Sequence, residues 1–552
     1  MTSARSLTPY LLAISAAAAL VFARTFEYSW WSNFIDLACS IQDDSFYYFI
    51  PAWNGGHGTG FTFGGQKTSG FQPLYEVILT LISPLCRSLE SLVRLSINLN
   101  GGLFAATGLV IGLATRPLIQ SSLPRLGRTA VVLSMSVAAF SFLSLHTVFF
   151  SSLTGKENAL AAALMATIIW IVLSGRRDAI GSSVLGLLCG LLLLTRIAPA
   201  SILYAGIAIA FVEGWKGRTT AMVACLIPLI AWALFAHLYF GHTLPMSMLV
   251  KVTTPNQLTI LQSLKSGLHY GWESGKFALS AGSRFNVPAL QARDGVRPIF
   301  QIVLMTLALG LSAFALLRSL LTRPISRPLL ILLALDVGSI ACNVLFGAAQ
   351  AGRSDDMYYS VWYIYDLPVL VAINCGFALA WLQAQLPIFS ASANARASAR
   401  ATAVLAIACA AYFIGDVVWY ARLKPYGSAD DAKFAVTWQI KKYEVADWFR
   451  RNVVPTHEDY KVVAFSAGAV AYYLFDHVVN LDGLANDAAG AAILSTHSAV
   501  GYANSIKPDY LIEVCPAEQH FANLERLHFI AFSKQGNYCI DRFIYQPTAP
   551  AN

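Results

Sequence analysis

The sequence predicts an α-helical polytopic membrane protein with about eleven transmembrane helices, followed by a soluble α/β domain at the C-terminus. Three observations support this fold class. The 552 residues are 56% hydrophobic and 12% charged, with a mean hydropathy of +0.56, whereas soluble proteins carry about 25% charged residues. Long apolar runs fill residues 1–420 and then stop. The charge balance changes at the same point, since residues 1–420 carry 26 Lys and Arg against 16 Asp and Glu, and residues 421–552 carry 12 against 14.

This composition excludes a disordered chain and an ordinary cytosolic enzyme. We expect a membrane domain over residues 1–420 and an extracytoplasmic domain over residues 421–552, in which strand-like runs at 461–465 and 478–481 alternate with helical ones. A basic excess over apolar spans is a topology signal rather than a nucleic-acid footprint, so no nucleic-acid partner is expected.

The individual spans are predicted from the apolar runs. The run 74–86 (LYEVILTLISPLC) reaches only about 20 Å as a helix, against a hydrocarbon core of about 30 Å. We therefore expect it to lie along the membrane surface as an interfacial helix. The predicted spans lie near 9–23, 93–115, 129–150, 159–174, 181–195, 198–212, 219–240, 298–317, 328–347, 362–385 and 401–420.

The basic residues predict which side of the membrane each loop faces. With 74–86 lying flat and the N-terminus inside, the clustered basic residues fall in cytoplasmic loops, as the positive-inside rule requires. The outer face then carries loops 24–92 and 241–297 and the domain 421–552. The first apolar run has no clear cleavage site and should remain as an anchor. The cytoplasmic clusters are Arg116, Arg125 and Arg128; Arg176 and Arg177; Lys216 and Arg218; Arg318, Arg323 and Arg327; and Arg396 and Arg400.

The nine cysteines show no metal-binding spacing, and five of them lie within apolar runs. Cys515 and Cys539 both lie in the C-terminal domain. They can pair as a disulfide if that domain faces an oxidising compartment.

Two adjacent acids in the first outer loop are candidates for chemistry. Asp43 and Asp44 lie in the segment IQDDSFYYF. Paired carboxylates near a membrane surface suit a general base or a cation site, whereas a solvated or helix-capping pair is the structural alternative. No cofactor is expected with certainty, and a divalent cation beside these two acids is the one candidate.

A glycine-rich segment follows, GGHGTGFTFGGQKTSGFQPLYE at 55–76. Its glycines permit close approach to a ligand and its aromatic rings can stack on a sugar or on lipid, while a flexible loop is the alternative. It lacks the GK[ST] ending of a phosphate-binding Walker loop. We assign Lys67 and Gln72 of this segment to substrate binding.

Isolated charged residues mark two short segments on the same predicted face. Glu157 follows Lys156 in a short outer loop, where a simple ion pair is the alternative to a ligand contact. Arg196 ends a span, where it either extends to the interface or binds an anion.

The later outer loops add further basic groups. His242 and Lys251 begin the second long loop, Arg284 lies near its end, and Arg353 lies in the next outer loop. Basic residues at this boundary suit a phosphate headgroup, and carboxylates beside them suit activation of a hydroxyl. Solvated loop charges are the alternative at each position.

Taken in chain order, these segments resemble a bacterial GT-C glycosyltransferase, similar to the arabinofuranosyl- and mannosyl-type enzymes. DDSFYYF with GFTFGGQKTSGFQPLYE resembles the acidic first-loop motif and its continuation. SLTGKENAL, LTRIAPA and YFGHTLPMSMLVK resemble the three motifs that follow it. GAVAYYLFDHVVNLDGLAND and IKPDYLIE resemble two stretches of the C-terminal part. No single motif is specific, so the resemblance rests on six motifs in family order.

The resemblance assigns roles residue by residue. Asp43 matches the first acid of the loop motif, the catalytic base, and Asp44 matches the second, a supporting acid or cation ligand. Glu157, Arg196 and Lys251 match the Glu, Arg and Lys of the next three motifs; we expect the two basic residues to bind the donor phosphate and Glu157 to bind substrate.

Two departures from the family pattern affect these assignments. Gln72 replaces a frequent His, and the segment VWYIYDLP lacks the family's RY pair. Arg353 and Arg284 are therefore additional candidates for the phosphate partner. His242 is assigned to substrate binding.

The resemblance implies an integral enzyme of the bacterial inner membrane, with a cytoplasmic N-terminus, that acts as a monomer. It would transfer a monosaccharide from a polyprenyl-phosphate donor to an extracytoplasmic glycan, lipid or protein. Two other classes stay open. A lipid-linked sugar flippase or transporter should carry ionisable residues deep within several spans, whereas here they gather at the ends. A non-catalytic membrane glycan-binding protein would tolerate the loss of both acids.

Overall fold

The computed structural model is mostly helical and divides into two compact units. The helical unit comprises Met1–Trp31, Ile97–Ala231 and Asn256–Ser428, and the loop unit comprises Ser32–Ser96, Trp232–Pro255 and Ala429–Asn552. The structure describes residues 8–32, 34, 37, 41, 43–175, 178–246, 259–278, 306–307, 309–315, 317–318, 321, 326–350, 364–386, 404, 435–454, 460–464, 467–481, 502, 506–514, 528–535 and 538–544.

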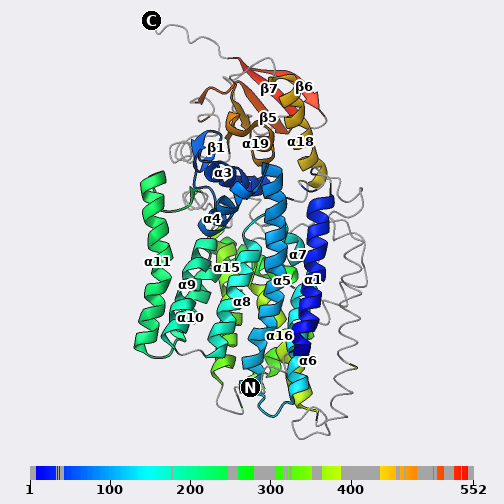
Figure 1. Cartoon of the computed structure of the whole chain (residues 1–552), viewed down its shortest axis with the longest axis vertical. Coiled ribbons are helices and arrows are strands. Elements are labelled where there is room, and N and C mark those ends of the chain that lie inside the picture. The colour runs from blue at the N-terminus through cyan, green and yellow to red at the C-terminus, as the bar shows by residue number, and fades with distance from the viewer. Residues whose placement is uncertain are drawn as a thin grey trace. The chain divides into compact units, whose positions relative to one another are not determined.

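The helical unit is built from long helices (Figure 1). Their buried side chains are mostly Leu, Ile, Val and Ala. Helix α6 packs on α1 and α16, α15 packs on α10 and α13, and α8 packs on α9. Helices α5 (Leu89–Ser122) and α11 (Trp215–Phe240) contribute residues to both units. The helices of this unit are α1 (Thr8–Trp31), α6 (Arg128–Leu143), α7 (His146–Ser152), α8 (Asn158–Ser174), α9 (Ala179–Thr195), α10 (Pro199–Ala210), α13 (Ile260–Ala278), α15 (Arg327–Gln350) and α16 (Asp366–Ala384).

Four helices in the described part of the chain are long and apolar enough to cross a membrane: Leu89–Ser122, Trp215–Phe240, Arg327–Ala349 and Asp366–Ala384. Shorter apolar helices accompany them, and large apolar side chains such as Leu226, Ile227 and Leu238 are exposed on α11. Exposed leucine and isoleucine on an apolar helix suit contact with lipid. The number of spans, predicted as about eleven, stays a prediction.

Most predicted spans coincide with helices, with three exceptions. The run 129–150 is divided, because α6 ends at Leu143 and α7 begins at His146. Nearly all of the run 401–420 and half of the run 298–317 lie outside the described residues. The interfacial helix predicted at 74–86 is a short helix, α4 (Pro73–Ile82), followed by the 3-10 turn η2 (Ser83–Leu85). Ten helical residues rise only about 15 Å, too little to cross a hydrocarbon core.

Helix α13 was not predicted, since it lies within the expected outer loop 241–297. Its glycines repeat every four residues, and a Cβ atom at Gly267 would lie 2.4 Å from the carbonyl oxygen of Val344 on α15. Small residues at this spacing allow two helix backbones to approach closely. On α13 the apolar side chains of Leu264, Leu268 and Trp272 stay exposed.

In the loop unit, the segment predicted as the first outer loop folds into a helix–hairpin–helix arrangement. The hairpin turn consists of Gly64 and Gly65, which both have positive φ (59° and 72°), as a two-residue turn of type I′ requires. Its elements are η1 (Asp43–Ser45), α3 (Phe46–Gly56), β1 (Thr62–Phe63), β2 (Gln66–Lys67), α4 and η2.

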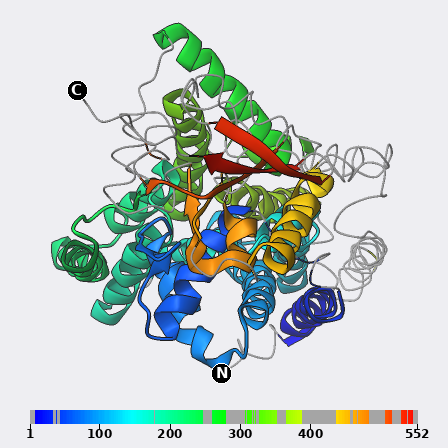
Figure 2. The same ribbon diagram turned by 90° about the horizontal axis from the view of Figure 1, so that it is seen from above.

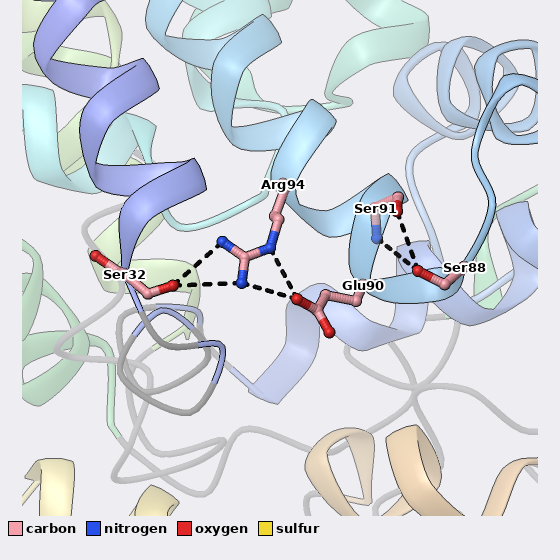
Figure 3. A network of polar contacts seen from close by, with 5 residues as sticks. All are labelled: Ser32, Ser88, Glu90, Ser91 and Arg94. Carbon is pink, nitrogen blue, oxygen red and sulfur yellow. Dashed lines mark hydrogen bonds and ion pairs between the residues drawn. The ribbon is translucent and has the colours of Figure 1, made fainter.

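Arg94 links the chain segments at the two ends of this loop (Figure 3). Its Nε and Nη2 atoms donate to Glu90 Oε1 at 2.9 and 2.8 Å, and Nη1 and Nη2 donate to the carbonyl oxygen of Ser32 at 3.3 Å. The N–H of Ser91 donates to Ser88 Oγ, which caps the start of α5. One guanidinium therefore joins residues 32 and 94, the two ends of the loop.

The C-terminal residues form a five-stranded sheet of order β4-β3-β5-β7-β6. Strand β3 is parallel to β4 and β5, whereas β7 is antiparallel to β5 and β6. Figure 2 shows these strands as the orange and red arrows. The predicted strands 461–465 and 478–481 coincide with β3 and β4. The elements are α18 (Ala435–Asn452), β3 (Val462–Ala464), α19 (Gly468–Leu474), η8 (Phe475–His477), β4 (Val478–Asn480), β5 (Tyr510–Val514), β6 (His528–Gln535) and β7 (Tyr538–Ile544).

The close packing of α9 yields a stability prediction. A Cβ atom at Gly186 would lie 2.0 Å from the carbonyl oxygen of Ala221, whereas one at Gly206 on α10 would meet nothing within 4 Å. We expect Gly186→Ala to lower the free energy of unfolding by about 1–3 kcal/mol and Gly206→Ala to leave it unchanged or raise it. Thermal unfolding of both variants in detergent tests this; equal melting temperatures would contradict the close approach.

Candidate functional site

The acidic motif of the first loop lies in η1, where the chain turns into α3. Asp43 is buried, with 7% of its surface exposed, and Asp44 is half-buried. Asp43 Oδ2 accepts a hydrogen bond from the N–H of Gly468 at 3.0 Å, and Oδ1 accepts one from the N–H of Ala469 at 2.9 Å. The carboxylate of Asp43 is thus bound through both oxygens to the start of α19.

The glycine-rich segment is held by backbone and side-chain hydrogen bonds rather than being an unstructured loop. Asn54 Nδ2 donates to the carbonyl and hydroxyl oxygens of Thr62 at 3.1 and 3.0 Å. The N–H of Phe61 donates to Tyr239 Oη at 3.1 Å, and the N–H of Met246 donates to the carbonyl oxygen of Ser69 at 3.1 Å. Residues 232–246 therefore bind this segment inside the loop unit.

Three residues assigned to substrate binding lie in or beside this segment. Lys67 is exposed, with Nζ 4.6 Å from the centre of the Tyr239 ring, a cation–π contact. His242 is half-buried, and its Nδ1 donates to the carbonyl oxygen of Leu244 at 2.8 Å. Gln72 precedes α4 and is half-buried. The structure places all three in the loop unit, together with the acidic motif.

A polar stripe runs along α4 from the residue before it, and of its members only Gln72 was a candidate in the sequence. Gln72, Glu76 and Thr80 recur every four residues, which places them on one side of the helix. Glu76 is fully buried, and within the described part of the chain neither of its carboxyl oxygens has a hydrogen-bond partner. Burial raises the pKa of the Glu76 carboxyl well above its usual value of 4.5. Burial therefore favours the neutral form of this carboxyl.

In the helical unit, Glu157 and Arg196 form a buried ion pair. Arg196 Nη1 lies 2.6 Å from Glu157 Oε1, and the two side chains are 5% and 1% exposed. The same nitrogen donates to Asn158 Oδ1 at 3.3 Å. Lys156 is also buried, and its carbonyl oxygen accepts from Asn100 Nδ2 at 2.9 Å. The segment 155–158, expected to be a small outer loop, is a buried turn that leads into α8 at Asn158.

Two further polar residues of this cluster were missed in the sequence. Tyr365 is close enough to Arg196 and Glu157 to interact with them electrostatically, and its hydroxyl lies 2.8 Å from Ser201 Oγ. Asp366 is fully buried, and its Oδ2 accepts from Asn343 Nδ2 at 3.3 Å. In the sequence these two residues form a Tyr-Asp pair at the start of an apolar run, in the segment VWYIYDLP that lacks the RY pair.

Several predicted residues lie outside the described part of the chain. These are the phosphate-binding candidates Lys251, Arg284 and Arg353, and Cys515; for Cys539 only the backbone of β7 is described. In the described ranges, no three His, Cys, Asp or Glu side chains come together as a metal site.

Comparisons with known proteins give the fold. The chain is similar to the crystal structure of ArnT from Cupriavidus metallidurans bound to undecaprenyl phosphate, at 14% identity and a TM-score of 0.54, over 97% of this chain and 98% of that one. The apo structure of the same protein matches at 12% identity and a TM-score of 0.57, again over 97% of this chain and 98% of that one. The chain has a GT-C-like fold. This confirms the fold that the motifs predicted.

Other comparisons add less. The oligosaccharyltransferase of Archaeoglobus fulgidus, tethered to an acceptor peptide, matches at 13% identity and a TM-score of 0.49, over 92% of this chain and 69% of that one. Residues 433–546 match the model of a domain of unknown function (DUF8728). No curated protein sequence matches the chain.

The buried ion pair predicts a strong stability effect. Glu157→Gln and Arg196→Met each leave one buried charge without its counter-ion, so each should lower the free energy of unfolding by about 3–5 kcal/mol. The double variant removes both charges and should recover most of that loss. Asp447→Asn, at a more exposed pair with Arg450, is the control and should cost under about 1 kcal/mol. Thermal unfolding in detergent measures all four variants. If the double variant lost as much unfolding free energy as the two single variants together, Glu157 and Arg196 would not interact as a pair.

The Glu76 carboxyl predicts a pH dependence. Because its pKa is raised on folding, its contribution to stability is complete below pH 4.5 and is lost as the pH rises through the folded-state pKa. Gln does not titrate, so Glu76→Gln should become more stable relative to the natural protein between pH 5 and pH 8. Melting temperatures at both pH values test this, with exposed Glu444→Gln as the control. A pH-independent difference would show that Glu76 stays in one charge state.

Proposed function

We propose that this protein is a membrane glycosyltransferase of the GT-C kind that uses a polyprenyl-phosphate-linked monosaccharide as donor. The observation that carries this proposal is the likeness of nearly the whole chain to ArnT, whose crystal structure holds undecaprenyl phosphate. An enzyme with a lipid-phosphate donor needs a base that takes the proton of the acceptor hydroxyl. It also needs cationic side chains that stabilise the charge of the departing phosphate. The acidic motif and the basic residues of the outer segments supply these groups.

The proposed reaction is a single inverting displacement. A carboxylate of the acidic motif takes the proton of an acceptor hydroxyl, the hydroxyl oxygen attacks the anomeric carbon, and the bond to the phosphate oxygen breaks. The polyprenyl phosphate leaves with the electron pair and its negative charge. The acceptor is an extracytoplasmic glycan, lipid or protein.

The base is proposed to be Asp43, the first acid of the motif. Both of its oxygens accept backbone N–H bonds, whereas the neighbouring Asp44 is less buried. Asp44 is therefore the second candidate for the same role, and single substitutions separate the two.

The donor phosphate is proposed to bind Arg196 and Lys251, with Arg284 and Arg353 as further candidates. A guanidinium is planar and carries five N–H donors, so Arg196 can serve Glu157 on one edge and a phosphate oxygen on another. Cations at the departing phosphate stabilise the charge that develops in the transition state. Glu157, Lys67, Gln72 and His242 are proposed to contact substrate.

The enzyme is proposed to act as a monomer in the bacterial inner membrane, with the N-terminus in the cytoplasm and the C-terminal domain outside. The positive-inside distribution of basic residues supports this orientation.

One observation favours a lipid-linked sugar transporter as the alternative. Asp336 lies in the middle of α15, where its Oδ1 accepts from Asn374 Nδ2 of α16 at 2.9 Å. An ionisable residue within a span is typical of a transport path. Transfer of a radiolabelled sugar in detergent separates the two, because a transporter or a glycan-binding protein transfers none.

The base assignment gives a direct test. Asp43→Asn removes the proton acceptor, so the transfer rate should fall by about 100- to 10,000-fold while binding of the donor stays measurable. The assay follows label moving from a polyprenyl-phosphate sugar to cell-envelope extract. Asp44→Asn is the matched variant. Natural turnover in Asp43→Asn with loss in Asp44→Asn would move the base to Asp44, and natural turnover in both would exclude the acidic motif.

A further inference from the structure

The start of α19 lacks the acceptor that a helix needs at its N-terminus. The first N–H groups of a helix have no partner within it, and a side chain at the preceding residue usually accepts one of them. Here the preceding residue is Ala467, whose methyl group cannot accept a hydrogen bond. Residues 467–469 are nevertheless fully or almost fully buried, so their N–H groups need acceptors from elsewhere in the chain.

The acidic motif supplies these acceptors from more than 400 residues away. The N–H of Ala467 donates to Tyr47 Oη at 3.1 Å, and those of Gly468 and Ala469 donate to the Asp43 carboxylate. Three successive N–H groups thus bind two side chains that are four residues apart on η1 and α3. Hydrogen bonds to a carboxylate are among the stronger ones in proteins.

Gly468 makes this contact sterically possible. A Cβ atom there would lie 2.1 Å from the carbonyl oxygen of Asp43 and 3.0 Å from Phe46 Cβ. The first of these is a backbone atom, so the chain itself would have to move to admit a side chain.

Aromatic rings extend the contact on both sides. Tyr472 of α19 stacks on Phe34 at 4.8 Å between ring centres and meets the edge of Phe46 at 5.8 Å. Phe46 also meets Tyr443 of α18 at 6.1 Å. Such pairs stabilise a specific arrangement of the two segments beyond the area they bury.

A second contact lies at the hairpin tip. A Cβ atom at Gly64 would lie 2.0 Å from the carbonyl oxygen of Val478 at the start of β4. The first loop therefore meets the C-terminal sheet domain at both the acidic motif and the glycine-rich segment.

We propose that residues 467–469 are the positioning element of the acidic motif, so that the C-terminal domain, residues 433–546, is a required part of the catalytic centre. This inference rests on the proposed function. The N–H groups of Gly468 and Ala469 fix the Asp43 carboxylate, and Tyr47 fixes the turn that carries both acids. Residues 467–469 contact no reacting atom in this role; they act through Asp43.

The test substitutes the C-terminal side of the contact and leaves both acids in place. Gly468→Ala forces the two segments apart and should lower kcat by about 100-fold, the effect of misplacing a reacting group by about 1 Å. Tyr47→Phe keeps the ring and removes one acceptor, so a loss of about 2- to 10-fold is expected. Gly206→Ala, where a Cβ meets nothing, is the matched control and should keep the natural rate.

Two readouts separate positioning from loss of folding. Hydrogen exchange at the amides of 468 and 469 should be faster in Gly468→Ala than in the natural protein, while exchange in α8 stays unchanged. When kcat/KM is plotted against pH, the acid limb should also move to higher pH in this variant, because withdrawing N–H donors disfavours the charged carboxylate. A protein that is only destabilised would show neither faster exchange confined to residues 468 and 469 nor this shift of the acid limb.

The outcomes distinguish this inference from the proposed function. If the natural protein transfers no sugar from any polyprenyl-phosphate donor, the proposed function fails. If the natural protein is active and Gly468→Ala keeps its rate and its pH profile, the positioning role fails while the function stands. Loss of activity in Gly468→Ala with natural exchange at 468 and 469 would also overturn the role, because the contact would then be intact.

Discussion

The hydrogen bonds from Gly468 and Ala469 to the Asp43 carboxylate are the interaction on which the loop unit depends. A buried helix that is preceded by alanine must find an acceptor for its first N–H groups elsewhere in the chain. Asp43 is that acceptor, and glycine at 468 lets the two backbones approach. One contact therefore joins residues 43–47 to the C-terminal sheet domain and sets the conformation of the two acids proposed for chemistry.

The helical unit is constrained by a different requirement, the pairing of buried charge. Arg196 and Glu157 are almost completely removed from solvent and lie 2.6 Å apart. Such a pair contributes little net stability compared with apolar side chains, and breaking it is costly. Its presence beside Tyr365 and Asp366 concentrates ionisable groups at the ends of apolar helices, an arrangement more typical of a functional site than of a structural core.

Much of the helical fold could be predicted from the sequence, because apolar periodicity acts locally. Helices α8 and α9 and strands β3 and β4 lie within a few residues of the predicted runs. Helix α13 was not predicted, since it falls within the expected outer loop 241–297 and its close contact with α15 at Gly267 involves residues far away in the sequence. The Glu76 carboxyl could not be recognised either, because nothing in PLYEVILTLI shows that this glutamate is buried and that the described residues offer its carboxyl no hydrogen-bond partner.

The sequence by itself determined the membrane class, the acidic pair as a candidate and the likeness to GT-C enzymes, because composition and short motifs are properties of neighbouring residues. Only the tertiary structure decided which residues contact each candidate site residue. In the structure Asp43 accepts hydrogen bonds from α19, Arg196 pairs with Glu157, and residues 232–246 lie against the glycine-rich segment. These partners are tens to hundreds of residues apart, and hydrogen bonds and ion pairs are set by distance in space, which local sequence patterns do not encode.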